Sequence, residues 1–94
     1  PILIYPGQSI TLQVVVSGQG VIGASPTMLM YKGTADDSSN VLANSMSVSG
    51  RTITLKTITA LAGGSEYIGY IFFTDAGKNT ARYFEVICPK LGVY

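Results

Sequence analysis

Hydrophobic residues recur at every second position in several stretches of the chain, which is the spacing of a β-strand that buries one face. In residues 10–16 the apolar positions alternate with Thr11 and Gln13. In residues 27–31, Met28 and Met30 share one face. This period predicts strands over residues 10–16, 27–31, 46–48, 51–58, 66–74 and 80–88, whereas residues 41–43 fit either a short edge strand or one helical turn.

Polar and glycine-containing segments separate the predicted strands. Ser49-Gly50 lies between two alternating stretches, which is typical of a tight hairpin turn, and residues 75–79 predict a second, polar hairpin loop. Residues 32–40 contain Gly, Asp-Asp and Ser-Ser and predict a polar loop or an irregular edge. No stretch of useful length has a helical period. We therefore expect a single all-β domain over residues 1–94, a sandwich of six to seven mostly antiparallel strands.

Residues 61–67 read Leu-Ala-Gly-Gly-Ser-Glu-Tyr. This segment resembles the Leu-x-Pro-Gly-Thr-x-Tyr pattern that precedes strand F in fibronectin type III and related immunoglobulin-like domains. The resemblance implies that Leu61 plugs the end of the sandwich, that Gly64 permits the tight crossing between sheets, and that the Tyr67 hydroxyl bonds upstream backbone. Gly63 replaces the proline of the pattern, and the chain has no tryptophan for the core. The resemblance is thus to the immunoglobulin-like β-sandwich as a superfold, not to a true fibronectin repeat.

The C-terminal half contains a second pattern. Residues 67–73 are an aromatic-rich strand, residues 74–78 (Thr-Asp-Ala-Gly-Lys) a turn, and residues 82–86 (Arg-Tyr-Phe-Glu-Val) a returning strand. Together they resemble the final hairpin of small immunoglobulin-like structural proteins of tailed bacteriophage virions. This resemblance implies a non-enzymatic virion protein made in the host cytoplasm, either a capsid decoration or a head, neck or tail component. Its implied partners are the major capsid protein or a neck or tail protein, and further copies of itself.

The composition argues against catalysis and nucleic-acid binding. The chain has no histidine, a single cysteine and only 12% charged residues, whereas general acid–base catalysis most often uses histidine. Without a base to activate it, Cys88 is interpreted as a small buried hydrophobe. The six basic residues are scattered singly, which gives no footprint for nucleic acid or an anionic membrane. The longest apolar run, residues 67–73, is too short to span a bilayer. We expect no enzymatic activity and no cofactor.

One pair of adjacent carboxylates, Asp36 and Asp37, raises the question of a metal ion. Calcium prefers several oxygen ligands, which such a loop could supply in part. Two carboxylates in a polar segment also fit a solvated loop, and this is the interpretation that we favour. No metal site is predicted.

The strand over residues 67–73 has more apolar residues than one buried face requires. If Tyr67 points into the core, then Tyr70 and Phe72 point outward, and the alternation in residues 80–88 places Tyr83 outward beside them. We predict that these three aromatic residues form a patch for protein contact, since exposed contiguous apolar area marks such contacts. The alternative is that a loop or a terminal segment covers the patch.

Both ends of the chain are apolar, and residues 1–7 and 89–94 are predicted to be either additional edge strands or arms that pack on a neighbouring subunit. On the second alternative, Ile4 and Tyr5 join the interface residues. The competing function is an immunoglobulin-like binding or adhesion module of a surface protein. In that case the loops at residues 32–40 and 75–79 would recognise a carbohydrate or protein ligand.

Overall fold

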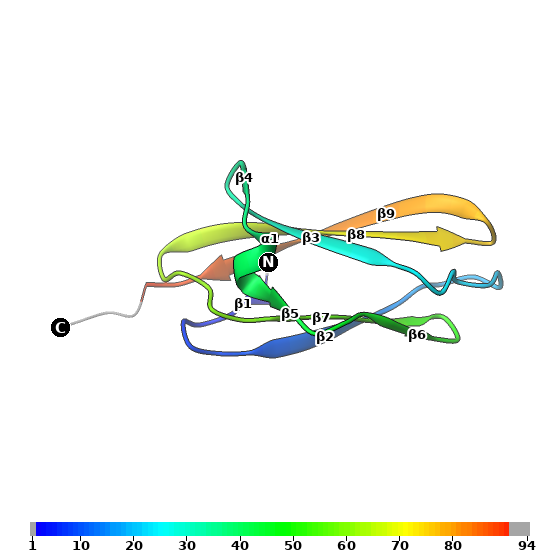
Figure 1. The fold of residues 1–94 in the computed structure, drawn as a ribbon, viewed down its shortest axis with the longest axis horizontal. Helices are drawn as coiled ribbons and strands as arrows, with labels where there is room; N and C mark the ends of the chain where they lie inside the picture. Colours follow the sequence, from blue (N-terminus) through cyan, green and yellow to red (C-terminus); the bar gives the residue numbers. More distant parts are fainter. Residues whose placement is uncertain (1, 91–94) are drawn as a thin grey trace.

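Two β-sheets lie face to face in the computed structural model, which describes residues 2–90 (Figure 1). Strands account for 57% and helix for 4% of the fold, so the predicted all-β class is confirmed. The elements are β1 (Ile2–Leu3), β2 (Ile10–Val15), β3 (Thr27–Lys32), β4 (Ala35–Asp36), α1 (Ser38–Val41), β5 (Leu42–Ala43), β6 (Ser47–Ser49), β7 (Thr52–Ile58), β8 (Ser65–Asp75) and β9 (Lys78–Cys88).

The first sheet has the strand order β1-β9-β8-β3-β4, and the second has the order β2-β7-β5 with β6 also paired to β7. All of the pairs between named strands are antiparallel except β1 with β9, which is parallel. The expected predominance of antiparallel pairing is therefore confirmed within residues 2–90. The strands are more numerous and several are shorter than predicted, because short edge segments such as β4 and β5 carry little periodic signal.

The core lies between the two sheets and is built by alternate residues, as the period of two predicted. On β8 the buried side chains include Tyr67 and Ile71, and on β3 they are Met28 and Met30. The second sheet contributes the buried residues Ile53, Leu55 and Ile58. No polar or charged side chain is buried among the described residues. The core is thus apolar apart from the hydroxyl of Tyr67, and its stability rests on hydrophobic burial.

The hairpin between β8 and β9 is tighter than predicted. The predicted loop over residues 75–79 is wrong, because Asp75 still pairs with Lys78 and the loop consists of Ala76 and Gly77 alone. Both loop residues have positive φ, 51° and 82°. This conformation matches the right-handed twist of the flanking strands and allows the two strands to continue to the last residue before the turn.

Two other boundaries differ from the expectation. The β6–β7 turn consists of Gly50 and Arg51, one residue later than predicted, with Gly50 at φ 60°. The segment that fitted either a strand or a helical turn contains both, since α1 ends at Val41 and β5 begins at Leu42.

The N-terminal residues belong to the sandwich itself. Strand β1 pairs with β9, and the N–H of Ile4 donates a hydrogen bond of 3.1 Å to the carbonyl of Ile87. The Ile4 side chain is fully buried. The assignment of Ile4 to an interface is therefore wrong, because its side chain is part of the core. Of the C-terminal segment, residues 91–94 lie outside the described residues. No helix among residues 2–90 has the length and apolar character needed to cross a membrane.

Candidate protein-contact surface

The outer face of the five-stranded sheet carries the predicted aromatic residues. Leu29 pairs with Tyr70, and Tyr70 pairs with Tyr83, so these three residues form one row across β3, β8 and β9. Residues directly opposite in an antiparallel ladder share a face. Tyr31 and Phe72 lie in the neighbouring rows on the same face. We define the aromatic face as the six residues Leu29, Tyr31, Ile68, Tyr70, Phe72 and Tyr83.

The rings of the aromatic face contact one another. Tyr31 and Tyr70 pack edge to face with centroids 5.6 Å apart and planes at 89°, and Tyr70 stacks on Phe72 at 6.4 Å and 17°. These contacts leave Tyr70 half-buried, whereas Phe72 is 39% and Tyr83 69% exposed. Sequence reasoning placed Tyr70, Phe72 and Tyr83 outward, as the structure does. It missed Tyr31, although the alternation of Tyr31 with Met30 was the signal that could have found it.

The outer face of the other sheet has a different chemistry. Side-chain hydrogen bonds join Thr11 to Thr57 at 2.7 Å, Gln13 to Thr54 at 3.2 Å and Ser9 to Thr59 at 2.8 Å. Val15 is the large apolar residue that stands out there, 73% exposed beside this polar surface. Hydroxyl and amide groups of this kind are well solvated. The two outer faces therefore differ, one polar and one aromatic.

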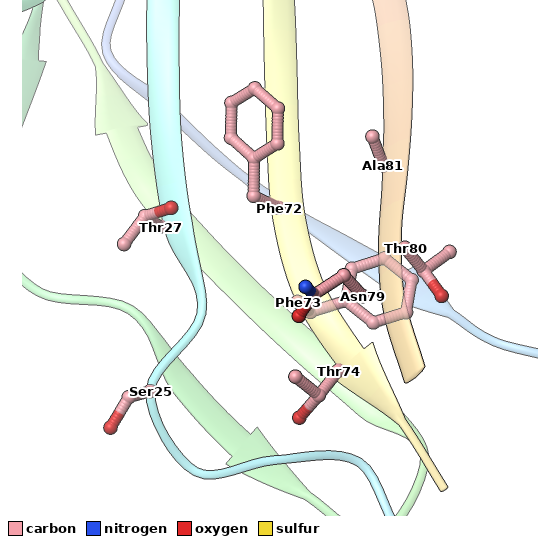
Figure 2. Close-up of a pocket in the computed structure, with 8 residues that line it drawn as sticks. All are labelled: Ser25, Thr27, Phe72, Phe73, Thr74, Asn79, Thr80 and Ala81. Carbon is pink, nitrogen blue, oxygen red and sulfur yellow. The ribbon is translucent and has the colours of Figure 1, made fainter. Parts of the chain in front are cut away.

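An open depression lies beside Phe72 at the end of the sheet near the β8–β9 turn (Figure 2). The Phe72 ring leans along β8 away from Thr74, and Thr27 and Ala81 flank it on the neighbouring strands. The residues that line the depression are all uncharged: Ser25, Thr27, Phe72, Phe73, Thr74, Asn79, Thr80 and Ala81. This part of the face combines one aromatic ring with hydroxyl and amide groups.

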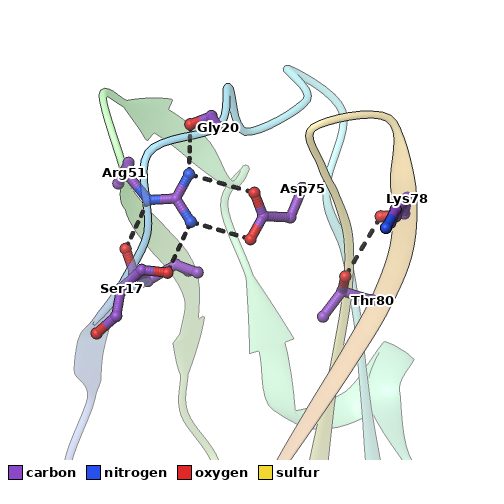
Figure 3. A network of polar contacts seen from close by, with 7 residues as sticks. Ser17, Gly20, Arg51, Asp75, Lys78 and Thr80 are labelled. Atoms are coloured by element: carbon purple, nitrogen blue, oxygen red, sulfur yellow. Dashed lines mark hydrogen bonds and ion pairs between the residues drawn. The ribbon is translucent and has the colours of Figure 1, made fainter.

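A network around Arg51 ties the two sheets together at the same end of the fold (Figure 3). The Arg51 guanidinium donates to both carboxylate oxygens of Asp75, at 3.2 and 2.9 Å. It also donates to the carbonyls of Val16 (2.8 Å), Ser17 (2.9 Å) and Gly20. The Arg51 hydrogen bond lowers the pKa of Asp75. Sequence reasoning treated Arg51 as an isolated surface charge, which is wrong, because five acceptors surround its side chain.

The segment before β8 has the geometry that the corner pattern implied. Tyr67 is 1% exposed, and its hydroxyl accepts a hydrogen bond of 2.9 Å from the N–H of Ala62. Leu61 is buried in the core. Gly64 has a φ of 78°, a conformation that strains residues with a side chain. The corner residues are therefore structural, and none of them lies on the aromatic face.

The loop with Asp36 and Asp37 uses its carboxylates locally. Asp36 accepts from the hydroxyl of Ser38 at 2.6 Å and from its N–H at 3.0 Å, and these bonds lower the pKa of Asp36. Asp37 accepts from the Asn40 amide at 2.7 Å. Residues 2–90 contain no cluster of three or more Cys, Asp or Glu side chains that could hold a metal ion. The carboxylates stabilise the turn around α1.

The remaining predicted residues are distant from the aromatic face or from one another. Tyr5 lies two residues beyond β1, whose last residue Leu3 pairs with Ile87, so the parallel register places it near Pro89, six residues and roughly 20 Å from Tyr83. The segment at residues 32–40, which contains β4 and most of α1, and the β8–β9 turn lie at opposite ends of β8. The structure thus does not combine the two loops into one binding site.

Cys88 is completely buried, and burial raises the pKa of its thiol. This agrees with its interpretation as a small core residue, since a nucleophilic cysteine needs an accessible thiolate.

Among the described residues, the aromatic face is the surface suited to protein contact. No family model matches the chain, and no match was found among curated proteins or solved structures.

Proposed function

We propose that the chain is a non-enzymatic structural protein that acts by packing its aromatic face against a neighbouring protein. The observation that carries this proposal is the contrast between the two outer faces. The second sheet meets water with hydroxyl and amide groups, whereas the first exposes Phe72 and Tyr83 in a cluster with Tyr31 and Tyr70. A cluster of aromatic side chains on one sheet, opposite a sheet that meets water mainly with hydroxyl and amide groups, is typical of a surface that contacts another protein.

The sheet that carries the aromatic face is long enough for a specific contact. Strand β8 has 11 residues, which gives a length of roughly 36 Å. A stable interface buries about 800 Å² per partner and is dominated by a few aromatic anchors at its centre. Tyr70 lies at the centre of the aromatic face between Leu29 and Tyr83. Among the residues of this face, Tyr83 and Phe72 are the most exposed side chains around it.

We further propose that the two sheets form an immunoglobulin-like sandwich and that the assembly is the virion of a tailed bacteriophage. The buried Tyr67 with its bond to Ala62 supports the first point, because this arrangement is typical of the tyrosine corner. The second rests on the resemblance of the β8–β9 hairpin to phage virion proteins. The chain would then serve as a capsid decoration or as a head, neck or tail component.

Mass spectrometry of particles purified from the organism that encodes the chain tests the virion assignment. We expect the chain to be present at a fixed ratio to the major capsid protein or to a neck or tail protein, across preparations and after a high-salt wash. Its absence from intact, infectious particles would contradict the assignment. The role of the aromatic face would then have to be tested on another assembly.

A second candidate, a carbohydrate-binding adhesion module, is favoured by one observation, the uncharged depression beside Phe72. An aromatic ring bordered by hydroxyl and amide groups can stack on a sugar and hydrogen-bond to it. Titration of the chain with neutral oligosaccharides, followed by NMR, separates the two candidates. Saturable shifts confined to Phe72, Thr74 and Asn79 would support the adhesion module, and no shifts would leave protein packing as the better account.

A further inference from the structure

The charged residues on the outer face of the five-stranded sheet all have the same sign. The register places Asp36, Glu66 and Glu85 on this face, because Asp36 pairs with Tyr31, Glu85 pairs with Ile68, and Glu66 lies two residues before Ile68 on β8 and so shares its face. All three are exposed. The chain as a whole carries six basic and five acidic residues and a net charge of +1. The aromatic face is thus bordered by acidic residues in a protein that is slightly basic overall.

The carboxylates lie at one end of the aromatic face. Asp36, Tyr31, Ile68 and Glu85 follow one another in a single row across β4, β3, β8 and β9, with an acidic residue at each end of the row. Glu66 lies in the row beyond, opposite Ile87. At the other end of the face, near the β8–β9 turn, the outward residues are the neutral Thr27, Thr74 and Asn79. The face is therefore acidic at one end and neutral at the other.

Five of the six basic residues point elsewhere, and the sixth, Lys90, follows β9 and lies against the corner at Gly63 and Gly64. Lys56 lies on β7 in the second sheet, and Arg51 is engaged in its network at the end of the fold. Lys78 and Arg82 alternate with the outward residues of β9 and therefore point toward the opposite side of the sheet. Lys32 directly follows the outward Tyr31 on β3 and therefore also points toward the opposite side of the sheet. No described basic residue of β3, β8 or β9 shares the outer face with the three carboxylates.

We propose that the aromatic face docks a protein surface that has an apolar centre and lysine or arginine side chains along one end. This inference rests on the proposed function and names the partner's chemistry. Complementary charge at the border of an interface selects the partner and speeds association, while the apolar centre supplies most of the affinity. A second copy of this chain does not offer such a face. Stacked face to face, two copies would bring carboxylates against carboxylates, or against the neutral end.

The free edge of β9 is a poor alternative route of association. Within residues 2–90, strand β1 covers β9 only at Val86 and Ile87, and no described strand pairs with this edge over the earlier part of β9. The carbonyl of Ile87 points to this edge, where it accepts from the N–H of Ile4. Backbone carbonyls point alternately to the two edges of a strand, so the carbonyl of Ala81, six residues earlier, points to the same edge. The Arg82 guanidinium donates to that carbonyl at 3.0 Å. Charged side chains placed in this way block strand addition, which leaves the face as the contact surface.

A pair of peptides of opposite charge tests the partner's chemistry directly. An alternating lysine–leucine hexapeptide and the matched glutamate–leucine hexapeptide are titrated into the full chain at low salt and followed by NMR. We expect the lysine peptide to shift the signals of Tyr70, Phe72, Tyr83 and Glu85, and the glutamate peptide to bind at least about tenfold more weakly. Raising the salt concentration should reduce the difference, because exposed charges are screened.

Variants separate the contribution of charge to the peptide affinity from the contribution of apolar contact. The double variant Glu66→Gln, Glu85→Gln should lower the affinity for the lysine peptide about fivefold. The double variant Gln13→Lys, Val15→Lys changes the net charge equally but on the opposite sheet, and should reduce the affinity far less. Tyr83→Ser should weaken both peptides and so reports on the aromatic face itself.

The outcomes distinguish this inference from the proposed function. Equal binding of both peptides at the aromatic face, lost in Tyr83→Ser, would overturn the basic partner and leave the packing surface intact. Shifts elsewhere, or none with either peptide, would contradict both. A wild-type dimer at micromolar concentration in sedimentation velocity, dissolved by Tyr83→Ser, would show that the occupant is a second copy.

Discussion

Arg51 and Asp75 form a bidentate ion pair that joins the β6–β7 turn of one sheet to the end of β8 in the other, with a closest N–O distance of 2.9 Å. The remaining guanidinium N–H groups bind the backbone after β2. Gly18 permits this approach, because a Cβ at that position would come within 2.8 Å of the Arg51 Nη2. Arg51 therefore fixes the path of the connection between β2 and β3.

Replacing Arg51 with methionine should destabilise the fold by about 2 kcal/mol, because three carbonyl groups and Asp75 lose their donor while the aliphatic part of the side chain is kept. Urea unfolding followed by circular dichroism measures the change. Lys56→Met removes a cation from the outer face of the second sheet and should shift the free energy of unfolding by less than about 0.5 kcal/mol. Equal effects of the two substitutions would mean that the network adds nothing to stability.

The acid stability of the protein should depend on Asp75. Its pKa is lowered in the folded state, first by the hydrogen bond from Arg51, so its contribution is fully present above the ordinary Asp pKa of about 3.9 and is lost as the pH falls through the folded value. Asp75→Asn should therefore be less stable than wild type at pH 7, and the difference should vanish in strong acid. Melting temperatures measured from pH 7 down to 2 provide the test. A difference that stays constant over this range would exclude the carboxylate as its source.

Gly69 is required by its neighbour across the hairpin. It pairs with Phe84, whose ring lies over it, and a Cβ at position 69 would overlap that ring. Gly69→Ala should cost about 2 kcal/mol of stability through overpacking. Phe84→Leu on its own should also destabilise, but the double variant should lose less than the sum of the two. Strict additivity in the denaturation data would show that the two positions do not interact.

The buried hydroxyl of Tyr67 should matter for stability, and the exposed one of Tyr83 should not. Tyr67→Phe leaves the N–H of Ala62 without its acceptor and should cost about 1 kcal/mol. Tyr83→Phe removes a hydroxyl from a side chain that is 69% exposed and should be nearly neutral. Thermal unfolding of the two variants, compared with the wild type, measures the loss of stability in each. A neutral Tyr67→Phe would show that water replaces the lost acceptor.

The sequence predicted those features that depend on alternation along a strand. With Tyr67 taken as a core residue from the corner pattern, the period of two placed Ile71 inside and Phe72 and Tyr83 outside, and the structure agrees. The tight turn at Ala76-Gly77 could not be anticipated in the same way, because an alanine with positive φ has no local signal that identifies it.

Features that depend on distant contacts were missed. The Arg51 side chain binds carbonyls 34 and 35 residues away in the chain, and neither the turn nor the scattered basic residues indicate these partners. Ile4 is buried because β1 adds to β9 in parallel, a pairing between the two ends of the described chain. Apolar character alone did not distinguish a core strand from an arm.

The central claim, that the aromatic face is the contact surface, is tested most directly by a matched pair of exposed residues. Tyr83 on the aromatic face is 69% exposed and Val15 on the polar sheet is 73% exposed. Tagged Tyr83→Ser and Val15→Ser chains, shown to have equal thermal transitions, are supplied during particle assembly, and their incorporation is quantified by mass spectrometry. We predict that Val15→Ser is incorporated as well as the wild type and that Tyr83→Ser falls about tenfold or more. Equal incorporation of the two variants would contradict the account.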